Sequence, residues 1–415
     1  MRYIFFILCF FLVLQSFSQD EFYMYHINPY NFIRNDLNHL DNFGSDPYSA
    51  QLFEKLEKLV RTGEGRINVV QIGGSHIQAG TFSGQIRSRM QQMNGDMNAG
   101  WGYMFPYRMA RTNSPYGYYI RFTGRWQACR NVERRKVCSL GVGGISATTT
   151  GENAKLTILL EDENKLDYRF HKVRVFCETS GAGYTVSVDS SYLKSIEKSD
   201  DYVEFELNTL VDSLNITIQK NSASAGSFTL HGITTESAPN GILYHSIGIN
   251  GAHVPAFLRC NLFEEQLEVL QPDLVILGLG INDAYVRRFS QHQFEDNYSE
   301  LIRSIRRASP KTAIIFFTNN DSYMYRRYVN KNGEKVEESM YKLADKFQCG
   351  VWDMFKIMGG LNSIVLWERN GLAQHDKIHF TREGYLTLGD LFFTAFMKSF
   401  ENYIEVKQQL TENKQ

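Results

Sequence analysis

Three side chains in this 415-residue sequence have the types and spacing needed to attack an ester. Ser75 carries a hydroxyl directly after Gly73 and Gly74, and Asp376 precedes His379 by three positions. An attacking hydroxyl needs a base that removes its proton and a third group that holds the base. A spacing of three lets the carboxylate reach the imidazole Nδ1 within one turn, which leaves Nε2 to face the hydroxyl.

Two further positions could stabilise the negative oxygen that such an attack creates. Asn282 follows the apolar segment 274–277, so its side-chain amide can point from the end of a strand. Gly251 ends the preceding candidate strand and can offer a backbone N–H. A second glycine-rich segment, 141–147, competes with Gly251. We prefer Gly251 because it lies one helix before the strand that leads to Asn282.

Each of these signals has an ordinary structural explanation when it is taken alone. A serine after two glycines often serves as a turn or helix cap, and an Asp-x-x-His pair often lies on the surface. Asn282 fits an Asx turn equally well, and Gly251 fits a turn that simply ends a strand. The chemistry is favoured by their common placement, because all of them lie at the ends of predicted strands or in the last loop.

The segments that must position these residues have the pattern of an α/β domain. Short apolar runs bounded by turns are typical of parallel strands that are buried on both faces. We expect such strands at 67–72, 242–249, 274–277, 313–317 and 350–352. Apolar residues at helical spacing predict helices at 48–61, 83–93, 254–270, 293–308, 334–347 and 385–403.

Residues 115–237 interrupt this α/β rhythm. Apolar residues there alternate with small polar ones, as in Tyr184, Val186 and Val188, and no helical pattern intervenes. Period-two runs separated by Gly, Ser, Asn and Asp predict an antiparallel β-sandwich of the jelly-roll kind. The sequence thus predicts a β domain inserted into one α/β domain, whose two parts are 19–114 and 238–405.

The overall composition excludes some classes of function. With 44 basic and 45 acidic residues the formal net charge is −1, which gives no support to nucleic-acid binding. The start of the chain, with Arg2, an apolar run over 3–14 and small residues at Ser16 and Ser18, predicts a signal peptide over 1–18. We therefore expect an exported protein, periplasmic or secreted, without a membrane span.

The cysteines of the mature chain form no metal-binding pattern. They are Cys129, Cys138, Cys177, Cys260 and Cys349. Cys129 and Cys138 could bridge a local hairpin in an oxidising compartment. We favour the other interpretation, in which all five are small buried apolar residues. No metal or organic cofactor is expected.

Ser75, Gly251, Asn282 and His379 with Asp376 occur in the order that defines the SGNH (GDSL-type) hydrolases, and the chain resembles this family over about 65–98 and 242–400. The resemblance implies a three-layer α/β/α fold. It also implies a catalytic triad of Ser75, His379 and Asp376, with an oxyanion hole formed by Ser75, Gly251 and Asn282. One departure is Gly74, which stands where the family usually has Asp.

The inserted β domain narrows the resemblance to the periplasmic peptidoglycan O-acetylesterases, which carry a carbohydrate-binding-type module at this place. The segments 73–79 and 98–107 also look like that branch. The resemblance implies removal of O-acetyl groups from a glycan, with cell-wall peptidoglycan as the expected partner. The alternatives are a glycan O-acetyltransferase, a lipase or thioesterase on the same fold, and an inactive glycan-binding protein.

Four residues are candidates for substrate contact. Trp101 and Tyr103 could stack on sugars, but packing in the core would explain them at least as well. His76 beside the nucleophile could touch substrate or make a structural hydrogen bond. Asn319 ends another predicted strand and could face the cleft or cap a turn.

Overall fold

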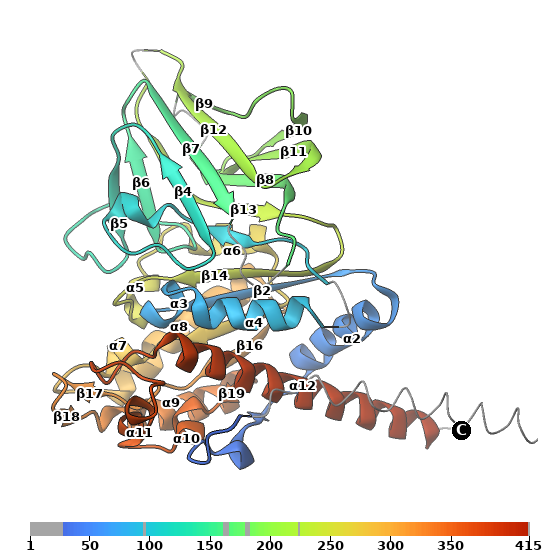
Figure 1. The fold of residues 1–415 in the computed structure, drawn as a ribbon, viewed down its shortest axis with the longest axis vertical. Helices are drawn as coiled ribbons and strands as arrows, with labels where there is room; N and C mark the ends of the chain where they lie inside the picture. The colour runs from blue at the N-terminus through green and yellow to red at the C-terminus, as the bar shows by residue number, and fades with distance from the viewer. Residues whose placement is uncertain (1–27, 94–96, 161–165, 179–182, 223–224, 414–415) are drawn as a thin grey trace, which may run out of the picture.

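The computed structural model describes residues 28–93, 97–160, 166–178, 183–222 and 225–413, so the predicted signal peptide lies outside the described residues. Figure 1 shows two parts, a β-rich part above and an α/β part below. The α/β part is formed by segments from both ends of the chain, with the β-rich part inserted between them. This confirms the predicted fold class.

A six-stranded sheet lies at the centre of the α/β part. Its strand order is β1 (Leu40–Asp41), β19 (Gly350–Trp352), β16 (Ala313–Phe317), β15 (Leu274–Gly278), β2 (Arg66–Gly73) and β14 (Gly241–Gly248). The edge strand β1 pairs antiparallel with β19, and the other pairs are parallel. All five parallel strands therefore end at the same edge of the sheet.

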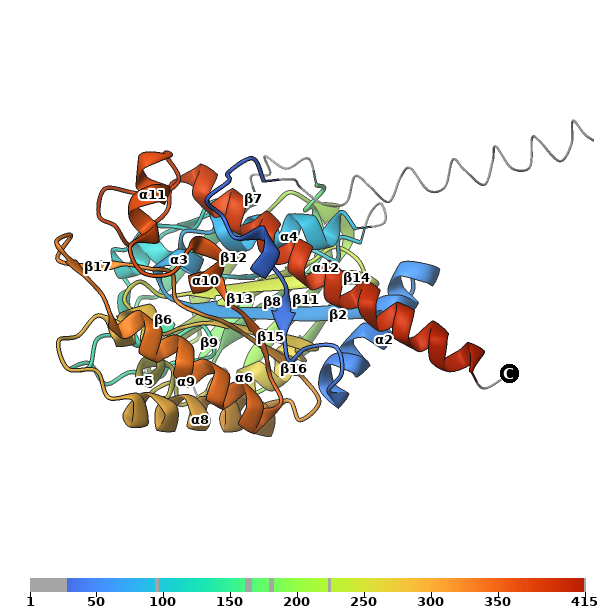
Figure 2. The ribbon, with the colours of Figure 1, turned by 90° about the horizontal axis from the view of Figure 1, so that it is seen from below.

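Helices cover both faces of this sheet, so the strands are apolar on both sides (Figure 2). On β2, Val70 and Ile72 face one apolar core, whereas Ile67 and Val69 face the other. The first core includes α6 (Phe263–Leu270), α8 (Gln291–Ala308) and α9 (Asn332–Phe347). The second includes α2 (Pro47–Thr62), α4 (Thr81–Gln91) and α12 (Arg382–Glu412). Short elements complete this part: the helices α3 (Ser75–Gln78), α5 (Val254–Phe257), α7 (Ile281–Ala284), α10 (Met354–Met358) and α11 (Ser363–Arg369), the strands β17 (Tyr323–Met324) and β18 (Tyr328–Val329), and 3-10 turns at Asn35–Leu37 and Tyr107–Ala110.

The inserted part contains two antiparallel sheets. One is formed by β10 (Leu193–Lys198), β11 (Tyr202–Val211), β8 (Phe170–Cys177), β13 (Phe228–Glu236), β6 (Ile145–Thr149) and β5 (Gln127–Arg130). The other is formed by β4 (Tyr118–Phe122), β7 (Asn153–Leu160), β12 (Ser213–Lys220) and β9 (Tyr184–Ser187). The strand β3 (Gly102–Met104) pairs with β13, and the insert shares one apolar core with the helical face that carries α8. The insert is therefore packed firmly onto the α/β part.

The predicted helix over 254–270 is wrong in its middle, because α5 ends at Phe257 and α6 begins only at Phe263. The side chain of Asn261 accepts the N–H of Leu140 at 2.9 Å, and the N–H of Leu262 donates to the Leu140 carbonyl at 3.0 Å. These bonds to the insert replace the bonds that a continuous helix would make within itself. Tertiary contacts thus override the helical pattern.

Two of the five cysteines are not free thiols, which corrects the interpretation favoured above. Cys129 and Cys138 form a disulfide that closes the loop between β5 and β6. Cys177, Cys260 and Cys349 are buried free thiols, as expected. Across the described ranges, no helix has the length and apolar character required to cross a bilayer.

Candidate active site

Ser75 lies on a tight turn between β2 and α3. The strand ends at Gly73, and a Cβ there would lie 2.4 Å from Ile77 Cγ1, so only glycine allows this turn. Ser75 is the first residue of α3, so its N–H points out of the helix end without an intrahelical partner. Its side chain is half-buried at the carboxyl edge of the sheet.

Ser75, His379 and Asp376 form a continuous hydrogen-bonded chain. Ser75 Oγ lies 2.8 Å from His379 Nε2, and His379 Nδ1 lies 2.7 Å from Asp376 Oδ2. The other carboxylate oxygen of Asp376 accepts the backbone N–H groups of Ile378 and His379, both at 2.9 Å. The turn passes through a left-handed Lys377 with φ of 57°. This arrangement can move a proton from the hydroxyl to the imidazole.

The carboxylate of Asp376 is held in its charged form. Burial raises its pKa, but the hydrogen bonds from the His379 backbone and side chain and from Ile378 outweigh burial, and the pKa lies below its usual value. A charged Asp376 keeps the proton of His379 on Nδ1 and stabilises an imidazolium.

Asn282 and Gly251 lie beside the Ser75 turn. Ile249, just past β14, donates its N–H to the carbonyl of Gly73 at 3.1 Å, which brings the Gly251 loop to the end of β2. Asn282 Nδ2 donates to the Ala252 carbonyl at 2.8 Å, which leaves its second N–H for another acceptor. Gly251 has a φ of 80°, which favours glycine. The N–H groups of Ser75 and Gly251 and the Asn282 amide therefore lie on neighbouring segments at the same end of the sheet.

Gly74 makes room for Asn282. A Cβ at Gly74 would lie 3.0 Å from Asn282 Nδ2, which is tighter than ordinary contact. The departure from the usual Asp thus falls at the point where the asparagine amide approaches the nucleophile turn.

His76 lies behind the triad. Its ring centroid lies 5.2 Å from that of His379, and its Nδ1 lies 2.8 Å from the hydroxyl of Tyr385. Burial, followed by repulsion from His379, lowers the pKa of His76 to about 3, so the ring stays neutral. A neutral neighbour adds no charge against an imidazolium at His379. The hydrogen bond to Tyr385 fits the structural interpretation of His76.

Trp101 and Tyr103 lie in the core. Trp101 is 4% exposed, and the Arg87 guanidinium covers its ring at 3.6 Å. Tyr103 is 1% exposed, and its hydroxyl donates to the carbonyl of His231 at 2.5 Å. A sugar could not stack on either ring without displacing these neighbours, so core packing accounts for both.

The segment that follows β16 is hydrogen-bonded to the loop that carries Asp376 and His379. Asn320 Nδ2 donates to the Ile378 carbonyl at 2.9 Å, one residue before His379. Asn319 is 5% exposed, and its Oδ1 packs against Gly280 rather than facing an open cleft. Of these two residues, Asn320 rather than Asn319 holds the loop that carries Asp376 and His379.

Sequence patterns missed a polar cluster that fixes the Gly251 loop. Gln78 accepts the N–H of Asn250 at 2.7 Å and donates to Thr112 Oγ1 at 3.0 Å and to Asn113 Oδ1 at 3.1 Å. Asn250 Nδ2 donates to the same two side-chain oxygens. No pattern in the sequence marks Gln78, because the predicted helix begins only at residue 83 and burial of the side chain is known only from the structure.

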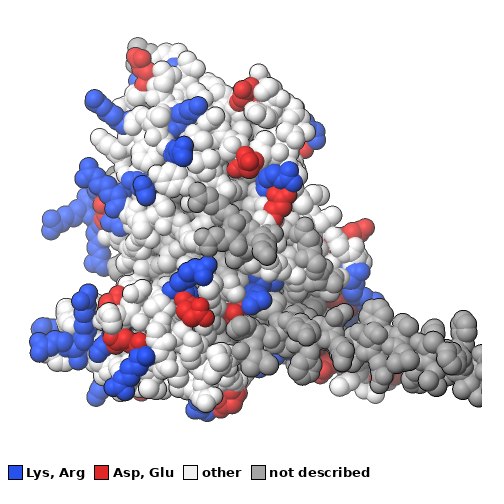
Figure 3. All heavy atoms as spheres, viewed as in Figure 1, with Lys and Arg blue, Asp and Glu red and all other residues white. Residues whose placement is uncertain are grey.

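The edge of the sheet that carries these residues is rich in basic side chains. Figure 3 shows Lys and Arg projecting along the left edge, where α5, α7, β17 and β18 lie in Figure 1. Within the described ranges, no group of three or more His, Cys, Asp or Glu side chains could hold a metal ion.

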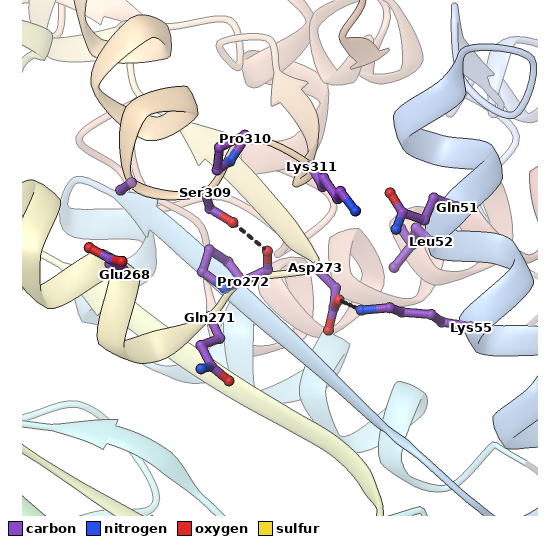
Figure 4. A pocket seen from close by; sticks show the side chains of 11 residues that line it. Gln51, Leu52, Lys55, Glu268, Gln271, Pro272, Asp273, Ser309, Pro310 and Lys311 are labelled. Atoms are coloured by element: carbon purple, nitrogen blue, oxygen red, sulfur yellow. Dashed lines mark hydrogen bonds and ion pairs between the residues drawn. The ribbon is translucent and has the colours of Figure 1, made fainter.

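A pocket of about 370 Å³ lies at the opposite edge of the sheet (Figure 4). Lys55 pairs there with Asp273, and Ser309 donates to the carbonyl of Pro272 at 3.2 Å. These residues precede β15 and β16, whereas ligands of parallel α/β sheets bind at the carboxyl ends of the strands. This pocket is therefore separate from the triad.

Residues 232–386 match the model of the GDSL-like lipase/acylhydrolase family. The α/β part belongs to the GDSL/SGNH hydrolases. The matched range contains Gly251, Asn282, Asp376 and His379, and the fold brings Ser75 to them from outside it.

Several solved structures are similar to this GDSL/SGNH hydrolase. A peptidoglycan O-acetylesterase structure matches with a TM-score of 0.73 at 21% identity, over 88% of this chain and 99% of that one. It therefore shares the fold of both parts, insert included. A lipase/acylhydrolase from Enterococcus faecalis has a TM-score of 0.31 at 19% identity, over 37% of this chain and 75% of that one. A family 3 carbohydrate esterase from Talaromyces cellulolyticus has a TM-score of 0.31 at 15% identity, over 40% and 74%. No curated protein sequence matches the chain.

Proposed function

We propose that this GDSL/SGNH hydrolase is an exported serine esterase that removes O-acetyl groups from a glycan, with peptidoglycan as the substrate. The observation that carries the proposal is the hydrogen-bonded chain from Ser75 through His379 to Asp376, beside the donors of Gly251 and Asn282. The shared fold with a peptidoglycan O-acetylesterase supports the choice of substrate. The disulfide and the predicted signal peptide support export.

The reaction begins when His379 Nε2 takes the proton of Ser75. The Ser75 oxygen forms a bond to the acetyl carbonyl carbon, and the carbonyl oxygen becomes the oxyanion. The N–H groups of Ser75 and Gly251 and the Asn282 amide stabilise this oxygen. His379 returns the proton to the sugar oxygen as its bond to the acetyl carbon breaks.

The acetyl group is then bound to Ser75, and water must remove it. His379 takes a proton from the water while its oxygen attacks the acetyl carbon. The bond to Ser75 Oγ breaks, the serine regains its proton, and acetate leaves. No group outside these residues is required for either half of the reaction.

The test is acetate release from O-acetylated peptidoglycan by the wild type and by Ser75→Ala. We expect the variant to be slower by roughly a thousandfold or more. Equal release by both proteins would refute the esterase. Transfer of acetyl to an added unacetylated glycan, in preference to water, would identify an acetyltransferase instead.

A further inference from the structure

Three separate loops carry exposed arginines to the edge of the sheet where the triad lies. They contribute Arg135 from the disulfide loop, Arg287 and Arg288 from the segment after α7, and Arg326 and Arg327 from the β17–β18 hairpin. We call these five residues the basic rim. Figure 3 shows basic side chains along this edge. Since the whole chain has a net charge of −1, this concentration is local.

The loop between β5 and β6, which the disulfide closes, is hydrogen-bonded to the loop that carries Gly251. Arg134, next to Arg135, places its Nη2 2.8 Å from His253 Nε2, and His253 follows Gly251 by two positions. The bond between Cys129 and Cys138 restrains the loop from the other end. The position of Arg135 is thus tied to the site.

The second segment continues directly from Asn282. Asn332 Nδ2 donates to the carbonyls of Ala284 at 3.0 Å and Val286 at 2.8 Å, so the chain is anchored immediately before Arg287. Arg287 and Arg288 are exposed beyond this anchor.

The hairpin is joined to the triad loop and to the second segment. Tyr323 donates its N–H to the carbonyl of Lys377, the residue after Asp376, at 3.0 Å. Tyr325 donates its N–H to the hydroxyl of Tyr285 at 2.7 Å. The turn holds Tyr325 and Arg326 at φ of 54° and 60°, and Tyr325 and Tyr328 are 60% and 61% exposed.

No ion pair among the described residues engages the five arginines of the basic rim. The acidic groups nearby have other partners or are half-buried: Glu133 pairs with Lys136 at 2.9 Å, Asp283 accepts the N–H of Val254, and Asp376 belongs to the triad. The positive charge of the five arginines is thus available to a ligand. Arginine forks match carboxylates, and exposed tyrosines offer faces for sugar rings.

We propose that the basic rim, with Tyr325 and Tyr328, binds a carboxylate-bearing glycan chain on either side of the ester that Ser75 attacks. This inference rests on the proposed function and specifies its substrate as anionic. Free carboxylates along the glycan would pair with the arginines, and neighbouring sugar rings would lie on the tyrosines. A neutral glycan or a neutral lipid lacks the carboxylates that this surface would bind.

The test compares O-acetylated peptidoglycan with the same material after its carboxylates have been converted to amides. We expect a KM for acetate release about threefold to tenfold higher on the amidated material, and a KM on the native material that rises with salt. Arg326→Gln/Arg327→Gln and Arg287→Gln/Arg288→Gln should each raise KM on native material by about the same factor. Turnover of 4-nitrophenyl acetate should be unchanged in both.

Lys58→Gln/Lys311→Gln is the matched control, because it removes equal charge from exposed positions away from the rim. Equal KM values on native and amidated glycan would overturn the inference and leave the esterase intact. If the protein cleaves no ester at all, co-sedimentation of Ser75→Ala with each of the two glycans still tests the carboxylate site. Equal binding of the native and the amidated glycan would refute such a site. Tighter binding to vesicles of anionic lipid than to native glycan would also refute it.

Discussion

Gln78 accepts the backbone N–H of Asn250 at 2.7 Å, one residue before Gly251. The helix α3, which begins at Ser75, therefore fixes the loop that carries Gly251, the proposed oxyanion donor. Because Gln78 also donates to Thr112 and Asn113, the same side chain links the helix and the loop to the segment just before the insert.

Gln78→Ala should lower kcat for 4-nitrophenyl acetate by roughly tenfold with little change in KM, because only a loosened transition-state donor is affected. Gln85→Ala is the control, since Gln85 bonds to Asp390 on α12 instead. Equal kcat values for the two variants would show that the Gln78 cluster does not position the donor.

Asp376→Asn should lower kcat by roughly a thousandfold or more, since an amide cannot hold His379 in the same protonation state. The matched variant is Glu368→Gln, because Glu368 pairs with the exposed His375 in the same segment. Steady-state kinetics on a soluble acetyl ester measures both. Retention of full activity in Asp376→Asn would remove Asp376 from the triad.

Asn282→Ala should lower kcat by about a hundredfold to a thousandfold through loss of one oxyanion donor. It also frees the Ala252 carbonyl, so circular dichroism and thermal unfolding must accompany the kinetics. Asn297→Ala, on the outer side of α8, should leave kcat unchanged. An unaltered kcat in a folded Asn282→Ala protein would contradict the assignment.

Asp283 makes stability depend on pH, because burial raises its pKa from 3.8 to about 7. The folded state therefore binds this proton more tightly than the unfolded state. As the pH rises from 3.8 to about 7, Asp283 progressively reduces the free energy of unfolding, and the reduction is complete above pH 7. Asp283→Asn keeps an acceptor for the N–H of Val254 and removes the free-energy cost of ionising a buried carboxyl group.

At pH 8 we expect Asp283→Asn to be more stable than the wild type by about 1–3 kcal/mol, with the difference vanishing near pH 4. Urea unfolding at several pH values measures it. Asp296→Asn, at an exposed position, should show no such trend. A difference that stays constant with pH would exclude titration of Asp283 as the cause.

The disulfide should stabilise the protein by about 2–3 kcal/mol, the chain-entropy estimate for a loop of this size. Cys129→Ser/Cys138→Ser should therefore unfold at lower denaturant concentration and be cleaved by trypsin between Arg130 and Lys136, which the bond encloses. Cys349→Ser, at a buried thiol, should not expose that loop. Resistance of the double variant to cleavage would show that other contacts hold the loop.

The sequence predicted the parallel strands well because burial on both faces imposes apolar runs such as Val69–Val70 and Leu274–Leu277. The contact between Asp376 and His379 could also be predicted, because the two residues are only three positions apart. The split between α5 and α6 was not, because it depends on hydrogen bonds to Leu140 far along the chain.

Other features depend on partners that no local pattern names. Arg87 covers the ring of Trp101, and the neutral state of His76 depends on burial and on the nearby His379. The β17–β18 hairpin has only two residues in each strand, too few for an alternating pattern to register. The sequence therefore suggested sugar stacking at Trp101, which is buried, and did not point to Tyr325 and Tyr328, which are exposed.

The placement of the insert affects how the chain must fold. Both sheet neighbours of β2, the strands β14 and β15, begin only at Gly241 and Leu274. At about 5–20 residues per second, synthesis leaves β2 without either partner for roughly 10–30 s. The strand that leads to Ser75 must therefore stay unpaired, and free of wrong partners, until the whole β insert has been made, which makes late, non-local pairing the slow step of its folding.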